Sequence, residues 1–79
     1  MDRKVIFDKQ GLEAFAAHLK KTRKELGITQ TQLAYKAGIS LTQIARIETV
    51  RINPTLSTVF SIVRGLDISL TRMFNFQLQ

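Results

Sequence analysis

Apolar residues recur every three or four positions over most of this chain of 79 residues, which is the spacing of amphipathic helices. The spacing predicts a first helix from about Gly11 to Leu26, and Gly27 is expected to end it. One face of this helix is apolar and consists of Leu12, Phe15, Ala16, Leu19 and Leu26. Arg23 falls on the same face, so its charge needs a partner inside the fold.

The next stretch, Thr29 to Glu48, contains two short helix signals separated by a tight turn. Thr29 with Gln32 forms a capping box for a helix that ends at Gly38, and Ser40 with Gln43 forms a second capping box immediately afterwards. So short a connection forces the two helices to cross at a steep angle. The pattern is that of a helix-turn-helix.

The second of these helices has an apolar side and a polar, cationic side. A rotation of 100° per residue places Ile44, Ile47 and Glu48 together and turns Thr42, Ala45, Arg46 and Thr49 the opposite way, with Leu41 beside them. Such a surface can enter a DNA major groove, where arginine pairs with guanine and apolar atoms meet a thymine methyl. It is also compatible with an ordinary solvated helix face. Because this surface belongs to a capped helix-turn-helix in a basic chain, we favour DNA binding over an ordinary solvated face.

A fourth helix is predicted to begin where Asn53 precedes Pro54, with Asn53 as its N-cap, and to end near Gly65. Its core stripe is expected to consist of Leu56, Val59, Phe60, Val63 and Leu66. Ile62 lies off that stripe and is expected to be either an isolated exposed residue or part of a partner surface. Ser69 would cap a short fifth helix through about Phe74.

These motifs resemble the lambda repressor and Cro-like (XRE) helix-turn-helix family over roughly Leu12 to Phe74. The family's marks stand in order: Arg23, T-Q-x-x-L-A (29–34), A-G-I-S (37–40), I-x-R-I-E (44–48), N-P (53–54) and L-x-x-x-F (56–60). One departure is Val50, which stands where many members have a glycine. A β-branched residue cannot cheaply adopt the left-handed turn that glycine allows.

The resemblance implies an all-α, five-helix lambda repressor-like fold in one domain, residues 1–79 with a core of 11–74. It implies base contacts from Leu41, Thr42 and Arg46, and phosphate contacts from Gln30, Ser40, Gln43, Arg51 and Asn53. It also implies a buried structural ion pair between Arg23 and Glu48. The expected function is that of a transcriptional regulator, a repressor, that binds double-stranded DNA. The alternative is an antitoxin similar to HipB, which would bind a toxin protein and autoregulate its operon; restriction-system controller proteins are similar as well.

Charge and composition agree with a DNA-binding role. Twelve Lys and Arg against six Asp and Glu give a net charge of +6, and residues 20–51 contain seven basic and two acidic residues, a net +5. This concentration of positive charge is what a polyanion binder needs, although basic domains can also simply be soluble.

Several other classes of function are not supported. The chain has no cysteine, and its single histidine, His18, lacks ligand neighbours, so we expect it at the surface and expect no metal or cofactor. No Ser, His and Asp set and no glycine-rich phosphate loop indicates an enzyme. The opening residues are charged where a signal peptide needs an apolar run, and no membrane span is present, so a cytoplasmic protein is expected.

The two ends of the chain carry a different pattern. Apolar and polar residues alternate from Phe74 to Leu78, and Lys4 to Phe7 is short and β-branched, so both ends are compatible with short strands or with frayed tails. Reading a near-palindromic operator requires two copies of such a domain, so a homodimer is expected. Its predicted interface consists of Val5, Phe7, Ile62, Phe76 and Leu78.

Overall fold

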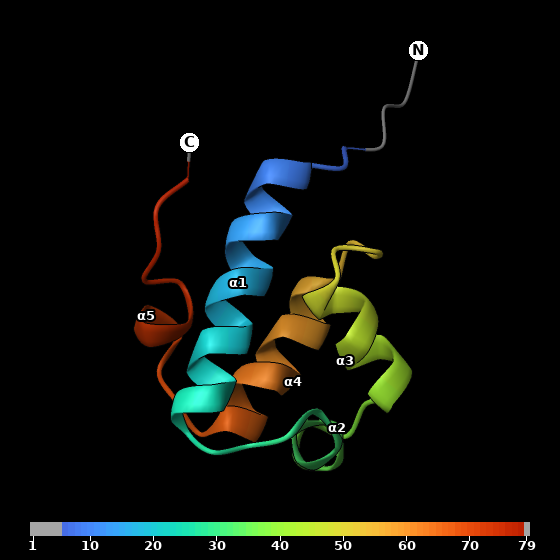
Figure 1. Ribbon diagram of the computed structural model, residues 1–79, viewed down its shortest axis with the longest axis vertical. Coiled ribbons are helices and arrows are strands. Elements are labelled where there is room, and N and C mark those ends of the chain that lie inside the picture. Colours follow the sequence, from blue (N-terminus) through green and yellow to red (C-terminus); the bar gives the residue numbers. More distant parts are fainter. Residues whose placement is uncertain (1–5, 79) are drawn as a thin grey trace.

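Polar side chains determine where each helix begins. The computed structural model describes residues 6–78, which form α1 (Lys9–Glu25), α2 (Gln30–Ala37), α3 (Leu41–Glu48), α4 (Leu56–Leu66) and α5 (Leu70–Met73) (Figure 1). Each helix has an N-cap side chain that accepts a hydrogen bond from a backbone N–H in the first turn; the caps are Asp8, Thr29, Ser40, Thr55 and Ser69. The five-helix prediction is therefore confirmed, and both predicted capping signals of the helix-turn-helix are present.

One cap was predicted wrongly. Thr55, not Asn53, caps α4, because the Thr55 hydroxyl accepts the Thr58 N–H at 3.2 Å. The Asn53 amide instead donates to the carbonyl of Ile6 at 3.2 Å, which ties the start of the described chain to the loop between α3 and α4. Threonine is also a favoured capping residue, and the contact to Ile6 engages the Asn53 side chain elsewhere.

Left-handed residues close four of the helices. Gly27, Gly38, Val50 and Asp67 have φ between 55° and 70°. Each lies at a helix end where its N–H and the next N–H return to carbonyls of the last turn, which is a Schellman motif. After α3, for example, the Val50 N–H donates to Ile47 at 3.2 Å and the Arg51 N–H to Arg46 at 2.8 Å. Val50 therefore adopts the left-handed conformation, which is energetically unfavourable for a β-branched residue.

All five helices contribute side chains to one hydrophobic core. Helix α2 packs against α4 and α3, and α1 packs against α3 and α5 (Figure 1). Residues with no exposed surface include Leu19, Leu33, Ile44, Ile62 and Met73. Helices α2 and α4 approach each other closely at Gly65, because a Cβ added there would lie 3.0 Å from the backbone nitrogen of Ala37.

The buried face of α4 differs from the predicted one. Ile62 is fully buried, so its expected place off the core and in a dimer interface is wrong. Phe60 and Leu56, which were assigned to the core, are 38% and 66% exposed. Val59, Ile62, Val63 and Leu66 form a stripe with spacing i, i+3, i+4 and i+7, which satisfies helical periodicity as well as the predicted stripe does. Packing against α2 selects between the two.

The ends of the described chain are not strands. Residues 6–8 and 74–78 contain no strand, and Val5 lies outside the described residues. The rings of Phe74 and Phe76 instead pack on Phe15 of α1, with centroids 5.8 and 6.3 Å away, so the C-terminal segment runs back along α1 (Figure 1). Phe7 and Leu78 are exposed.

His18 is half-buried rather than at the open surface. Its Nε2 lies 2.6 Å from the carbonyl of Arg72, and its ring lies 5.3 Å from that of Phe76. It joins α1 to α5. Between residues 6 and 78, no helix has the length and apolar character that crossing a membrane would require.

Candidate nucleic-acid interface

The outward face of α3 is exposed and is supported from beneath by the core. Ile44 and Ile47 are buried under the helix, whereas Leu41, Thr42 and Arg46 are exposed. The exposed residues line a shallow hollow together with Gln30, Ala45, Thr49 and Arg51. The three side chains predicted to contact bases therefore lie together, and two of the predicted phosphate contacts lie beside them.

Local caps fix the orientation of this face. Gly38 takes a left-handed conformation at the end of α2, and the Ser40 hydroxyl accepts the Gln43 N–H at 3.1 Å at the start of α3. Helix α2 begins with both hydrogen bonds of its capping box. The backbone N–H of Gln32 donates to the Thr29 hydroxyl at 3.0 Å, and the backbone N–H of Thr29 donates to the side-chain Oε1 of Gln32 at 2.9 Å. Short helices with closed ends and a fixed turn present the α3 side chains from a rigid support.

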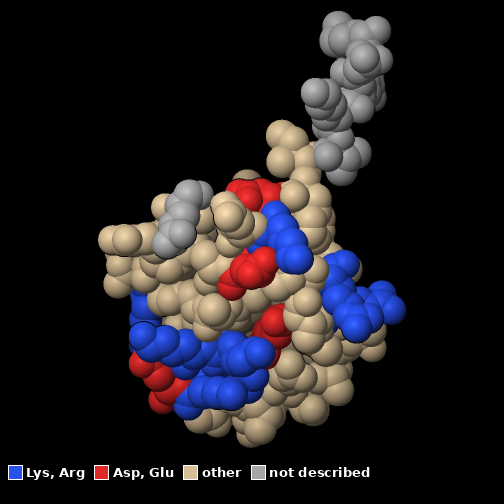
Figure 2. Space-filling view, turned by 45° about the horizontal axis from the view of Figure 1, so that its top comes forward, with Lys and Arg blue, Asp and Glu red and all other residues tan. Residues whose placement is uncertain are grey.

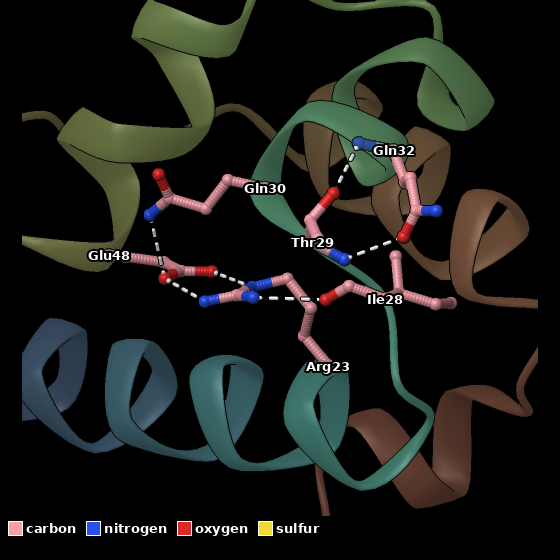
Figure 3. A network of polar contacts seen from close by, with 6 residues as sticks. All are labelled: Arg23, Ile28, Thr29, Gln30, Gln32 and Glu48. Atoms are coloured by element: carbon pink, nitrogen blue, oxygen red, sulfur yellow. Dashed lines mark hydrogen bonds and ion pairs between the residues drawn. The ribbon is translucent and has the colours of Figure 1, made fainter.

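An ion pair ties α3 to α1. Arg23 Nε and Nη2 donate to the two carboxylate oxygens of Glu48 at 2.7 and 2.9 Å, and Nη1 donates to the Ile28 carbonyl at 2.9 Å. The exposed fractions of the two side chains are 9% for Arg23 and 1% for Glu48. Figure 3 shows Arg23 rising from α1 to the carboxylate, with Gln30 of α2 on its far side. The predicted pair is thus present, buried and bidentate.

The pair is held in its charged form. Burial alone would raise the pKa of Glu48, but hydrogen bonds from Arg23 and Gln30 and the positive charges of Arg23 and Lys20 outweigh it and lower that pKa. The hydrogen bond to Glu48 raises the pKa of Arg23, although burial acts the other way. Lys20 was expected on the solvated face of the first helix, and its charge also acts on the Glu48 carboxylate.

The predicted phosphate contacts fall into two groups. Gln30 is half-buried, and its Nε2 donates to Glu48 at 3.0 Å, which leaves its second N–H for another acceptor. Arg51 is exposed, while its own N–H closes α3. Asn53 does not line the hollow, because its amide nitrogen binds Ile6. Ala45 and Thr49, which were predicted on the outward face but not as DNA contacts, also line the hollow.

Basic side chains are exposed around α3. Figure 2 shows Lys and Arg side chains gathered in bands, with carboxylates at their edges. Exposed basic residues on the elements around α3 include Lys20, Lys24, Lys36, Arg46 and Arg51. Over the part of the chain that the structure describes, no group of three or more His, Asp or Glu residues could hold a metal ion.

Known proteins with similar sequences include a phage repressor and an antitoxin. Over 53 residues, or 67% of the chain, the sequence is 43% identical to the immunity repressor protein of Bacillus phage phi105 and 40% identical to antitoxin HipB of Escherichia coli K12. The matched segment spans 37% of the phage repressor and 60% of HipB, which is less than two thirds of either relative.

Solved structures with a similar fold include restriction-modification controller proteins. C.Esp1396I has a TM-score of 0.77 and 36% identity, with 80% of this chain and 81% of that chain covered. C.AhdI from Aeromonas hydrophila has a TM-score of 0.77 and 25% identity, with 81% of this chain and 97% of that chain covered. C.Esp1396I is also known bound to a 19 base pair DNA duplex and as a tetramer with its natural 35 base pair operator.

A described protein family also matches most of the chain. Residues 19–73 match the family described as Helix-turn-helix, HTH_3. The matched range contains α2, the turn and α3, and both partners of the buried ion pair. Because this range covers more than half of the sequence, the chain belongs to the HTH_3 helix-turn-helix family.

Proposed function

We propose that this protein binds double-stranded DNA sequence-specifically, as a homodimer on a near-palindromic operator, and regulates transcription as a repressor. One observation carries the proposal: the exposed face of α3 brings Leu41, Thr42 and Arg46 into one hollow with Gln30 and Arg51. The phage repressor and the DNA-bound controller protein support it, because both are similar in sequence and the second is similar in fold.

Base recognition is assigned to the first turns and the centre of α3. The Arg46 guanidinium suits the two acceptors of a guanine edge, the Thr42 hydroxyl can donate or accept, and Leu41 offers apolar contact to a thymine methyl. The Thr49 hydroxyl already donates to the Ala45 carbonyl at 2.8 Å, so we give it no role in reading bases.

Phosphate contacts are assigned around the rim of the hollow. Gln30 and Arg51 lie there, and Ser40 and Gln43 lie at the start of α3, near the N-terminal end of its dipole. One N–H of the Asn53 amide is bonded to the carbonyl of Ile6, so only its second N–H can donate to a phosphate. These contacts would fix the position of α3 on the duplex without reading sequence.

Salt dependence tests the nucleic-acid assignment. Each neutralised phosphate contributes a slope of about −0.9 to a plot of log affinity against log salt concentration. We therefore expect affinity for duplex DNA to fall steeply as salt rises, in fluorescence anisotropy titrations. Binding that is absent at low salt, or that does not respond to salt, would contradict the proposal.

Paired arginine variants test which face enters the groove. After selection of an operator from a random DNA pool, Arg46→Ala should cost about 1 to 3 kcal/mol on that operator and relax preference at one position. Arg51→Ala should weaken binding to every sequence. Arg64→Ala is the matched control, since Arg64 is exposed on α4 and does not line the hollow. Equal losses on operator and unrelated DNA for both test variants would show that the assigned face is wrong.

A second function is favoured by one observation, the 40% identity to antitoxin HipB. In that role the protein would bind a toxin protein and also repress its own operon. A toxin gene encoded next to this one, and a stable complex of the two products on co-expression, would support the antitoxin role. Without such a neighbouring gene, only the proposal of a transcriptional regulator would stand.

A further inference from the structure

The buried ion pair has a third partner, and that partner reaches the proposed DNA surface. Gln30, the first residue of α2, donates from its Nε2 to Oε1 of Glu48 at 3.0 Å. Gln30 is half-buried and also lines the hollow on α3, whereas Arg23 and Glu48 do not line it. The Gln30 side chain therefore connects the buried pair to the surface that we assign to DNA.

The Glu48 carboxylate determines which end of the Gln30 amide faces inward. Burial acts to raise the pKa of Glu48, but hydrogen bonds from Arg23 and Gln30 lower it, so the carboxylate is ionised. An ionised carboxylate accepts hydrogen bonds and donates none. The NH2 group of Gln30 must therefore face Glu48, and its amide oxygen must turn away. Figure 3 shows this orientation, with the Gln30 nitrogen directed at the carboxylate.

The carboxylate is itself held in place. Arg23 Nε and Nη2 donate to its two oxygens at 2.7 and 2.9 Å, and the Glu48 side chain is 1% exposed. Arg23 comes from α1, Glu48 from α3 and Gln30 from α2, so three helices converge on one network. Glu48 is therefore a fixed acceptor, and the Gln30 amide is oriented against a rigid support.

An amide that is fixed in this way suits a phosphate acceptor. The Gln30 NH2 group has two N–H donors, and the bond to Glu48 leaves the second one for another acceptor. An unattached glutamine amide could present its oxygen instead, which a phosphate oxygen repels. Immobilising a flexible side chain during binding also lowers affinity, and an amide that is ordered before DNA arrives avoids this loss.

We infer that Glu48 is a positioning residue for DNA binding, which holds the Gln30 amide so that its second N–H meets a DNA phosphate. This inference rests on the proposed DNA binding and gives a role in it to a side chain that does not reach the DNA. Arg23 takes part by fixing the carboxylate. An ion pair with a structural role alone would change the stability of the fold and leave the affinity of the folded protein unchanged.

The experiment uses a variant that removes the acceptor and keeps the fold. Arg23→Met/Glu48→Leu replaces the pair with apolar side chains, a change that is often neutral for stability in buried pairs, and it leaves the net charge unchanged. Arg72→Met/Glu25→Leu is the matched control, because it makes the same change in an exposed pair, 3.8 Å apart, that does not line the hollow. Circular dichroism establishes that each variant is folded, and fluorescence anisotropy measures its affinity for the selected operator.

The expected result is a loss that does not add to that of Gln30→Ala. Affinity should fall about fivefold in Arg23→Met/Glu48→Leu and about fivefold in Gln30→Ala, which is the effect of one hydrogen bond. The variant with all three substitutions should bind no more weakly than either, because residues that act through one another are not additive. The control should bind like wild type.

Nuclear magnetic resonance of the isotope-labelled wild-type protein tests the same inference without any variant, and it decides the question if Arg23→Met/Glu48→Leu does not fold. When operator is added, the side-chain proton of Gln30 that is bonded to Glu48 should keep its chemical shift, while the second proton should move.

Three results would overturn the inference. They are a folded Arg23→Met/Glu48→Leu with wild-type affinity, a triple variant whose loss is the product of the two separate losses, and a Gln30 amide that leaves Glu48 when DNA binds. Wild-type affinity in Gln30→Ala would likewise reject the positioning role and leave the proposed DNA binding intact. A wild-type protein that binds no DNA would instead reject the proposed function itself.

Discussion

The buried ion pair between Arg23 and Glu48 should carry much of the stability of this domain. Replacing Glu48 with alanine removes the acceptor of three hydrogen bonds, two from Arg23 and one from Gln30. The Arg23 guanidinium then stays buried with the Ile28 carbonyl as its remaining partner. Leaving one member of a buried pair uncompensated costs about 3 to 5 kcal/mol. A domain of this length has a stability of only about 5 to 10 kcal/mol, so the loss is a large share of the total.

The comparison that isolates this effect uses chemical denaturation of four variants. Arg23→Met and Glu48→Ala should each lower the free energy of unfolding by about 3 to 5 kcal/mol, whereas Arg23→Met combined with Glu48→Leu should lie much closer to wild type. Glu25→Ala is the control, because Glu25 lies 3.8 Å from Arg72 with both side chains about half exposed. Its expected cost is below about 1 kcal/mol. A Glu48→Ala loss as small as that of Glu25→Ala would refute the reasoning.

Three further predictions concern stability. The lowered pKa of Glu48 means that its contribution is present above the ordinary value of 4.5 and is lost as pH falls through the lower folded value; the free energy of unfolding of wild type should therefore fall more steeply below pH 4.5 than that of the Arg23→Met/Glu48→Leu variant. At Val50, whose φ is 59°, glycine should give a protein more stable than alanine by about 1 kcal/mol in thermal melts, and the reverse order would contradict a left-handed end of α3. Gly65→Ala should destabilise by about 1 to 3 kcal/mol, because its methyl group would lie 3.0 Å from the Ala37 nitrogen; an unchanged melting temperature would show that α2 and α4 separate easily.

The parts of the fold that sequence reasoning predicted correctly have causes within a few residues. A capping residue and the N–H that it binds lie three positions apart, so Thr29 and Ser40 identified the starts of α2 and α3 without knowledge of the rest of the chain. The outward face of α3 follows from its own periodicity. The proposed base-contacting residues were accessible to prediction for this reason.

The errors have causes elsewhere in the structure. Two apolar stripes on α4 satisfy helical spacing equally well, and the choice of the one that buries Ile62 and exposes Phe60 depends on where α2 packs. Asn53 is a good capping residue, yet its amide binds the carbonyl of Ile6, 47 positions away in the sequence. The alternation of apolar and polar residues from Phe74 to Leu78 is compatible with a strand. In the structure, however, the rings of Phe74 and Phe76 pack on Phe15 of α1.

The same distinction applies to two concave surfaces of the molecule. The hollow on α3 is built from two neighbouring short helices and the residues just after them, so its lining residues come from one continuous stretch, residues 30–51. A groove at the first turns of α1 and α4 combines residues 6–15, 53–59 and 74–78, three stretches that only the tertiary fold brings together. A substitution in any one of them alters the groove without touching α3.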